Sequence, residues 1–228
     1  MLLEKNPFFR GKTLYFQPLV ADSPLKIKKS AFAYAQSRPR RPSAGKIASL
    51  YSLESDSTMT QAATPSFATC DLCDAHKNDT SGQFRVLPPV FKDFGAAQKF
   101  SGPVATVKCF EDNTFVKAAV DSPGLGRVLV VDGGASLRRA LLGGNLGAAA
   151  AKNGWAGVVI DGCVRDLAEL AQCNTGIRAL AAMPLPTEKR QEGQRDVAVQ
   201  IQGVWVRPGD WLYADEDGIV VMPAPAVA

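Results

Sequence analysis

The chain has 228 residues, of which 46% are hydrophobic and 21% charged, and its formal net charge is +4. This composition is typical of a globular protein with enough apolar material for a core that needs no disulfides. No apolar run approaches the roughly 20 residues that a membrane-spanning helix requires, which excludes that class of protein.

The positive charge is concentrated at the start of the chain. Residues 1–60 contain ten Lys/Arg and four Asp/Glu, whereas residues 61–228 contain sixteen and eighteen. The second part therefore lacks the basic excess expected of a domain that binds nucleic acid phosphates. The basic, serine-rich first part resembles an organelle transit peptide, and an extension without any address function stays open. We predict a leader over 1–60, a domain over 61–228, and a cytoplasmic or organellar location.

Helices and strands alternate along the predicted domain. Helices are predicted at 69–77, 113–122, 136–154 and 166–174, and strands at 102–112, 127–134, 156–166, 196–206, 210–214 and 218–223. The central strand–helix–strand order favours parallel pairing of its two strands. The strand-rich last third, with turns at glycine-containing pairs, favours antiparallel pairing. The sum is an α/β domain with a separate antiparallel layer.

The ends of the two central strands are the first candidates for a site. These strands reach Asp132-Gly133-Gly134 and Asp161-Gly162, and ligands collect beyond the carboxyl ends of strands in open α/β sheets. Arg165 and Asp166 follow at once, at the start of a predicted helix, and can project together into such a crevice. A local salt bridge and a helix N-cap are the alternative interpretation of this pair.

A second candidate is the glycine pair Gly143-Gly144 inside the predicted helix 136–154. Each mid-helix glycine costs about 0.8–1 kcal/mol relative to alanine. The break would create a new helix start at Asn145 and Leu146, whose free amides suit an anion. Arg165 could clamp the same carboxylate. Asp166 could hold Mg²⁺ or Mn²⁺, since such cations often use only one or two protein carboxylates.

Cys70, Cys73 and His76 invite a zinc or redox interpretation, but no fourth ligand is suitably spaced, and we expect ordinary packing. His76 is also the only histidine, which leaves little for Ser-His or Cys-His catalysis. The odd number of cysteines, five, indicates a reducing compartment with buried thiols.

Several ordered motifs resemble one known family. TVKCFEDN, GRVLVVDGG, ALLGGNLGAAAAKNGWAGVVIDGCVRD and GDWLYADEDGIVV are similar to the RraA-like family, over about residues 69–223. That family includes 4-hydroxy-4-methyl-2-oxoglutarate aldolases and the regulator of ribonuclease activity A. The resemblance implies a three-layer β/β/α swivelling-domain fold and a homotrimer. It also implies that Gly143, Gly144, Asn145 and Leu146 bind substrate, that Arg165 binds it too, and that Asp166 binds the metal.

The function implied by the resemblance is a class II lyase that uses Mg²⁺ or Mn²⁺. It would release pyruvate from small 2-oxo dicarboxylic acids by aldol cleavage, or from oxaloacetate by decarboxylation, with Arg165 and Asp166 as catalytic residues. Aldolase members carry an aspartate where this chain has Gly144, which favours decarboxylation, because that reaction deprotonates no alcohol. The alternatives are a regulator that binds and inhibits a ribonuclease, with a vestigial site, and a binding module without turnover.

Overall fold

The structure is a computed structural model that describes residues 66–226, so the predicted leader over residues 1–60 lies outside the described residues. Within the described part, none of the helices has the length and apolar character needed to cross a membrane.

One large sheet and one hairpin account for all eleven strands of the described part. The helices are α1 (Thr69–His76), α2 (Thr114–Val120), α3 (Gly144–Lys152) and α4 (Leu167–Leu170). In spatial order, the main sheet contains β1 (Arg85–Val86), β11 (Ile219–Met222), β10 (Trp211–Ala214), β3 (Phe100–Lys108), β4 (Val128–Leu142), β5 (Gly157–Val164), β6 (Gly176–Ala182) and β2 (Lys92–Asp93). Strand β7 (Gln194–Arg195) pairs with β3, and β8 (Val199–Ile201) forms a hairpin with β9 (Val204–Val206).

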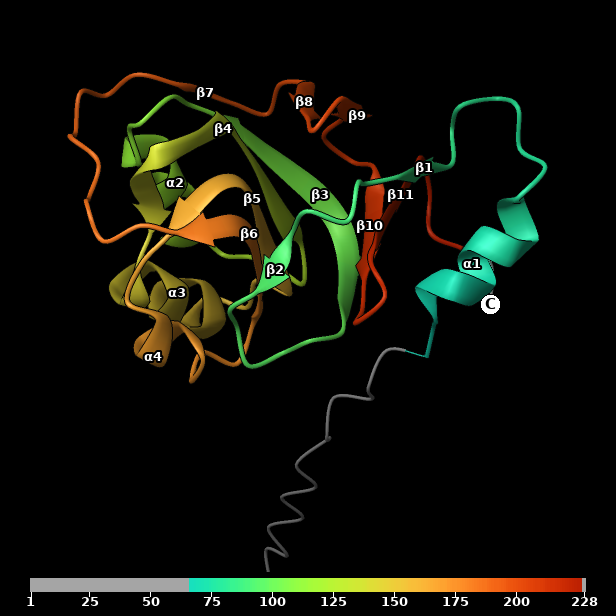
Figure 1. Cartoon of the computed structure of the whole chain (residues 1–228), viewed down its shortest axis with the longest axis horizontal. Helices are drawn as coiled ribbons and strands as arrows, with labels where there is room; N and C mark the ends of the chain where they lie inside the picture. The colour runs from blue at the N-terminus through green and yellow to red at the C-terminus, as the bar shows by residue number, and fades with distance from the viewer. Residues whose placement is uncertain (1–65, 227–228) are drawn as a thin grey trace, which may run out of the picture. The chain divides into compact units, whose positions relative to one another are not determined.

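The strands β3 to β6 are parallel and form the middle layer of the domain. Successive side chains of a strand point to opposite faces, and β4 uses both faces. Leu129 and Val131 belong to the core cluster that contains residues of α2 and α3, whereas Val128 and Val130 pack in the cluster with β8 and β9. Figure 1 shows the helices α2, α3 and α4 on one side of these strands and β8–β11 on the other. The predicted three-layer β/β/α fold is confirmed.

The strand pairings predicted for the two halves are also confirmed. Strands β4 and β5 run parallel, with Val128 opposite Gly157 at their start. Strands β10 and β11 are antiparallel, as are β8 and β9. Strand β6 was not among the predicted strands, because its sequence, GIRALAA, carries no alternation of polar and apolar residues.

The predicted helix over 136–154 is wrong in its first half. Strand β4 continues through Asp132 and pairs with β5 as far as Leu142 opposite Val164, with register shifts on the way. Its last three residues are buried in the sheet, which satisfies their backbone groups without a helix. The glycine pair therefore begins α3 instead of interrupting a longer helix, and the mid-helix cost of glycine does not arise at these positions.

Candidate active site

Two neighbouring parallel strands bring the glycine turn and the Arg165-Asp166 pair to one edge of the sheet. Leu142, the last residue of β4, lies opposite Val164, the last residue of β5. The Arg165 amide donates a hydrogen bond to the Leu142 carbonyl at 2.9 Å, so the chain segments stay together just past the strand ends. Gly143 and Arg165 consequently face one another, as the sequence pattern predicts for the carboxyl edge of a parallel sheet.

The start of α3 presents amides that can receive an anion. The Gly143 carbonyl accepts hydrogen bonds from the amides of Leu146 and Gly147, both at 3.0 Å. The Gly144 amide donates to Oδ2 of Asp166 at 3.1 Å. No hydrogen bond within residues 66–226 uses the Asn145 amide. That amide, together with the positive end of the helix dipole, is available to a carboxylate.

Asp166 has a left-handed backbone conformation, with φ 59° and ψ 47°. This region costs a residue other than glycine roughly 1–2 kcal/mol, although aspartate tolerates it better than most. Asp166 precedes α4, yet its side chain makes no capping hydrogen bond to that helix. The carboxylate reaches the start of α3 instead, and its Oδ2 lies 3.4 Å from Nε of Arg165. The salt bridge of the alternative interpretation is present, and the side-chain cap is not.

Gly143 permits the close approach of these two side chains to the turn. A Cβ atom at position 143 would lie 2.5 Å from Oδ2 of Asp166 and 3.1 Å from Cγ of Arg165. Any larger residue there would displace the Asp166 carboxylate, since real Cβ contacts are not as short as 2.5 Å, and would press on the Arg165 side chain. The glycine is needed for space and not for its backbone freedom, because its φ of −132° is ordinary extended geometry.

A cavity of about 250 Å³ lies in front of this turn. Five of the six predicted site residues line it, namely Gly143, Asn145, Leu146, Arg165 and Asp166. Gly144 does not line the cavity, and it contributes through the hydrogen bond that its backbone amide donates to Asp166. The volume is slightly below the roughly 300–1,000 Å³ typical of pockets for drug-sized ligands, and so fits a small acid.

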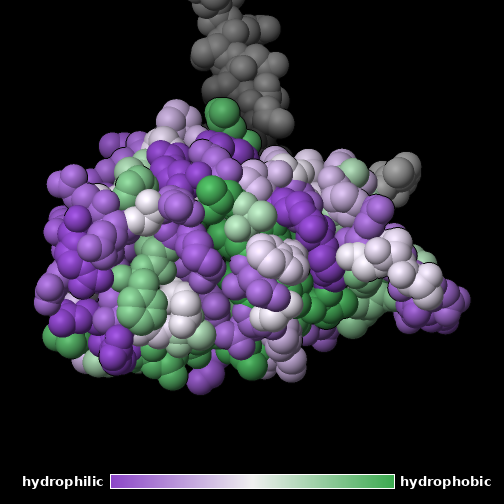
Figure 2. Space-filling model, turned by 90° about the horizontal axis from the view of Figure 1, so that it is seen from above, coloured by the Kyte–Doolittle hydropathy of each residue, from purple (hydrophilic) through white to green (hydrophobic). Residues whose placement is uncertain are grey.

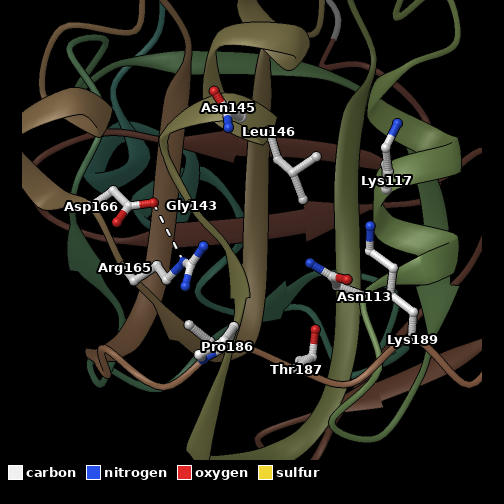
Figure 3. A pocket seen from close by; sticks show the side chains of 11 residues that line it. Asn113, Lys117, Gly143, Asn145, Leu146, Arg165, Asp166, Pro186, Thr187 and Lys189 are labelled. Atoms are coloured by element: carbon white, nitrogen blue, oxygen red, sulfur yellow. Dashed lines mark ion pairs between the residues drawn. The ribbon is translucent and has the colours of Figure 1, made fainter. Parts of the chain in front are cut away.

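The opposite side of the cavity contains residues that the sequence reasoning missed. We call Asn113, Lys117, Thr187 and Lys189 the lysine wall. In Figure 3, Arg165 and Asp166 lie on one side of the cavity, and the lysine wall lies across from them. Asn113 immediately precedes α2 and Lys117 lies in its last turn. The spacing of four residues places them on one helix face and is visible in the sequence. Thr187 and Lys189 lie in an irregular segment that carries no such pattern.

Glu169 occupies the space beside Gly144. A side chain at position 144 would run into the carboxylate of Glu169, and its Cβ would lie 2.8 Å from Cβ of Glu169. Glu169 thus fills the space that an aspartate side chain at position 144, as in aldolase members of the resembled family, would need. Glu169 nevertheless lines a different hollow, on the other side of the turn, together with Gln172 and Asn174.

The donor atoms in the cavity fit a hard divalent cation bound mainly through substrate and water. No group of three or more His, Cys, Asp or Glu side chains that could hold a metal gathers within residues 66–226. Asp166 supplies one carboxylate, 39% exposed, whose Oδ1 takes part in no hydrogen bond or ion pair of the described part. One such oxygen is the kind of ligand with which Mg²⁺ is commonly held while it keeps several waters.

The segment that carries Thr187 and Lys189 is fastened at both ends. On one side the Ala140 amide donates to the Leu185 carbonyl at 2.8 Å. On the other side buried Asp112 accepts hydrogen bonds at its Oδ2 from the amides of Arg190 and Glu192, at 2.7 and 3.0 Å. Thr187 and Lys189 are therefore held in place between two anchors.

The hydrogen bonds from the amides of Arg190 and Glu192 to Asp112 can be tested by measuring the stability of the protein in acid. Burial alone would raise the pKa of Asp112, but hydrogen bonds from Thr114, Glu192 and Arg190 outweigh it and lower the pKa from 3.8 to about 2. A carboxyl whose pKa is lower in the folded state stabilises the fold above pH 3.8, and this contribution is lost as the pH falls towards 2. We expect the melting temperature of Asp112→Asn to fall less than that of the parent between pH 4 and pH 2. The role would be contradicted if thermal melts showed that the melting temperatures of the variant and the parent fall equally between pH 4 and pH 2.

The side chains of Cys70, Cys73 and His76 lie on helix α1, and His76 makes contacts with its neighbours in the described part of the chain. The His76 ring stacks on Phe84 with centroids 4.7 Å apart, and its Nδ1 lies 2.8 Å from the Leu72 carbonyl. All five cysteines are free thiols, and three of them are buried.

Comparison with known proteins agrees with the motifs. The family model described as "RraA-like: Aldolase/RraA" matches residues 69–221, which is more than half of the chain. The chain belongs to the RraA-like family. One relative, from Albidiferax ferrireducens, bears the name "Putative 4-hydroxy-4-methyl-2-oxoglutarate aldolase". It is 77% identical over 166 residues, which cover 69% of this chain and 96% of the relative.

Two further relatives show the breadth of the RraA-like family. A protein of the same name from Burkholderia multivorans is 58% identical over 156 residues, covering 68% of this chain and 95% of its own. A solved structure described as the RNA-processing inhibitor RraA from Thermus thermophilis is 45% identical, with a TM-score of 0.67. The match covers 72% of this chain and 97% of the chain in that structure. Names of an enzyme and of an inhibitor thus both occur among the relatives.

Proposed function

We propose that this RraA-like protein is a lyase that releases pyruvate from small 2-oxo dicarboxylic acids with the help of Mg²⁺ or Mn²⁺. One observation carries the proposal: Asp166 adopts a strained backbone conformation and directs its carboxylate at the start of α3, beside Arg165. Strain of this kind gathers at functional sites, because the surrounding structure must hold it in place. The relatives named as aldolases support the same class of reaction.

The residues of the cavity have distinct parts in this chemistry. The Asn145 amide and Arg165 bind the carboxylate next to the 2-oxo group and hold the acid in one orientation. Asp166 would hold the divalent cation, which would supply Lewis-acid polarisation of the 2-oxo group when bound. Arg165 stabilises the negative charge that develops on the pyruvate enolate, where a fixed cation contributes most.

Two reactions share this enolate. In decarboxylation of oxaloacetate the C3–C4 bond breaks, its electron pair forms the enolate, and C4 leaves as CO₂. In aldol cleavage of a 4-hydroxy-2-oxo acid the hydroxyl proton passes to water, the C4 carbonyl forms, and the C3–C4 electron pair again forms the enolate. A proton from water then converts the enolate to pyruvate. Gly144 supplies no side chain for the hydroxyl proton, which favours the first reaction.

A coupled assay tests this proposal. Oxaloacetate and Mg²⁺ or Mn²⁺ are mixed with the protein, and pyruvate is followed with lactate dehydrogenase and NADH. The slow decarboxylation caused by the metal alone is measured without protein and subtracted. We expect pyruvate release that requires both protein and metal and stops when EDTA is added. No release above the metal-only rate, from oxaloacetate or from 4-hydroxy-4-methyl-2-oxoglutarate, would refute the proposal.

A second candidate function is regulation of a ribonuclease by direct binding. The observation that favours it is the 45% identity to the structure described as an RNA-processing inhibitor. In that case the cavity would be vestigial, and the outer surface would carry the function. Absence of pyruvate release together with inhibition of an RNA-degrading endonuclease by the purified chain would establish this alternative.

We also propose a homotrimer located in the cytoplasm or in an organelle. Three large apolar side chains, Phe110, Leu137 and Leu185, are about half exposed. All three lie at the second half of β4. Leu137 belongs to that strand, the Arg138 guanidinium lies 5.8 Å from the centre of the Phe110 ring, and the Leu185 carbonyl accepts a hydrogen bond from the Ala140 amide. Apolar side chains exposed in one region are often covered by another subunit. In the view of Figure 2 the surface is mostly hydrophilic, with hydrophobic residues in several separate groups. The five free thiols agree with a reducing compartment.

A further inference from the structure

The lysine wall contains two polar atoms that the protein itself leaves unpaired. Oδ1 of Asn113 and Oγ1 of Thr187 are buried, and neither has a hydrogen-bond partner within the described part of the chain. Buried polar atoms without partners are rare in folded proteins, and each one calls for an explanation. Both residues line the cavity, so a bound ligand can contact the Thr187 hydroxyl and the Asn113 amide group.

The lysine wall also carries a cation without a counter-ion. Nζ of Lys189 takes part in no hydrogen bond or ion pair with residues 66–226, whereas Lys117 pairs with Asp121 four residues later on α2. On the other side of the cavity Arg165 and Asp166 already face one another. The cavity therefore has an excess of positive charge, and the excess lies at the lysine wall, away from the turn.

The position of Lys189 is fixed by the rest of the fold. Its segment is fastened to β4 through Leu185 and to the start of α2 through Asp112, as described above. Arg139 adds a third tie, since its Nη1 donates to the Pro186 carbonyl at 2.9 Å. These bonds order the backbone at Lys189 although its side chain is exposed, so less conformational entropy is lost when this lysine binds an anion than if it lay on a free loop.

We propose that the lysine wall binds the second carboxylate of the substrate, the one that Arg165 and the start of α3 do not hold. This inference rests on the proposed function and names the residues that hold the far carboxylate of its dicarboxylic substrates. Lys189 is the main cation, Thr187 donates a hydrogen bond, and Asn113 contributes through its amide NH₂, since the two ends of an amide side chain can be exchanged. Lys117 plays a smaller part, because Asp121 already neutralises it.

The assignment has a consequence for the choice between the two reactions. A lysine that pairs with the second carboxylate stabilises its ionised form in the ground state. This contact is lost when that group leaves as neutral CO₂, and an interaction stronger in the ground state than in the transition state slows the reaction. In aldol cleavage the second carboxylate stays ionised on the departing product and keeps its contact. The lysine wall therefore favours aldol cleavage, in the opposite direction to Gly144.

Binding of two matched acids tests the inference without any turnover. 2-Oxoglutarate has a carboxylate at each end, and 2-oxopentanoate has the same carbon chain with a methyl group in place of the second one. Calorimetric titration of the full chain with Mg²⁺ present gives the Kd of both acids. We expect 2-oxoglutarate to bind at least ~10-fold more tightly, as charge-assisted pairing allows. We expect Lys189→Gln to reduce this ratio to about threefold or less, and Lys117→Gln to reduce it by a smaller factor.

Lys152→Gln is the matched control, because it removes the same charge at a distance from the site. Lys152 lies in the last turn of α3, at the end of that helix away from the cavity. The ratio is expected to be unchanged in this variant. The inference is overturned if the parent shows no preference for 2-oxoglutarate, binds neither acid, or keeps its preference in Lys189→Gln. A preference that Lys189→Gln abolishes, in a protein that releases no pyruvate, would retain the subsite and refute the lyase.

Discussion

Asp166→Asn is expected to lower the metal-dependent release of pyruvate at least ~100-fold while leaving the fold intact. Asparagine keeps the size of the side chain and an oxygen that can accept the hydrogen bond of the Gly144 amide. It loses the negative charge, which is what a Mg²⁺ or Mn²⁺ ion needs from its single protein carboxylate. Because asparagine also tolerates the left-handed region, thermal unfolding should change by no more than about 0.5 kcal/mol.

Two readouts separate loss of metal from loss of structure in this variant. The paramagnetic signal of free Mn²⁺, titrated with protein in the presence of pyruvate, should show weaker binding by Asp166→Asn than by the parent. Glu169→Gln is the control, since Glu169 is three residues away but lines the hollow on the other side of the turn. It should keep its activity within about twofold. Equal pyruvate release by Asp166→Asn and the parent would remove Asp166 from the reaction.

Gly143→Ala is the second change with a large expected effect. The new methyl group would lie 2.5 Å from Oδ2 of Asp166, so this carboxylate must move. It would lie 3.1 Å from Cγ of Arg165, so this side chain must give by a few tenths of an ångström. A displacement of about 1 Å in a catalytic arrangement can cost on the order of 100-fold in rate. The backbone of Gly143 is extended, which alanine adopts freely, and the loss of stability should therefore stay within the roughly 1–3 kcal/mol of local overpacking.

Steady-state kinetics on oxaloacetate, together with thermal melts, measure both effects of Gly143→Ala. We expect kcat to fall with a modest change in melting temperature. Gly218→Ala is a suitable control, because a Cβ there meets no atom within 4 Å and the residue has no positive φ. It should leave kcat unchanged. If Gly143→Ala retained full activity, the close packing of the turn against Asp166 and Arg165 would have no part in catalysis.

The side of the cavity that contains Arg165 and Asp166 could be predicted from sequence, because it follows from local rules. Two parallel strands end at the same edge of a sheet, and the residues just after them must therefore meet. The glycine turn was placed correctly although the helix around it was not. Residues 136–142 have leucines and alanine at spacings that suit a helix, and pairing with β5 decides for a strand instead.

The lysine wall could not be predicted in the same way. Thr187 and Lys189 come from a segment without regular structure, about twenty residues after Arg165. Their place opposite the turn depends on hydrogen bonds to Asp112 and Ala140, far away in the chain. Contacts of this kind leave no periodic signal in the sequence. The left-handed conformation of Asp166 is equally invisible there, since aspartate before a helix normally indicates an N-cap.

The two sides of the cavity differ in how well they tolerate amino-acid substitutions, because only one of them continues from strand β4. The glycine turn continues directly from a strand that crosses the centre of the sheet, and a substitution that moved it would disturb the buried core. The segment over 185–192 is attached by a few hydrogen bonds at its ends. New side chains can enter it at little cost to folding. One scaffold could in this way keep its means of stabilising an enolate while mutation of the opposite segment alters which acids it accepts.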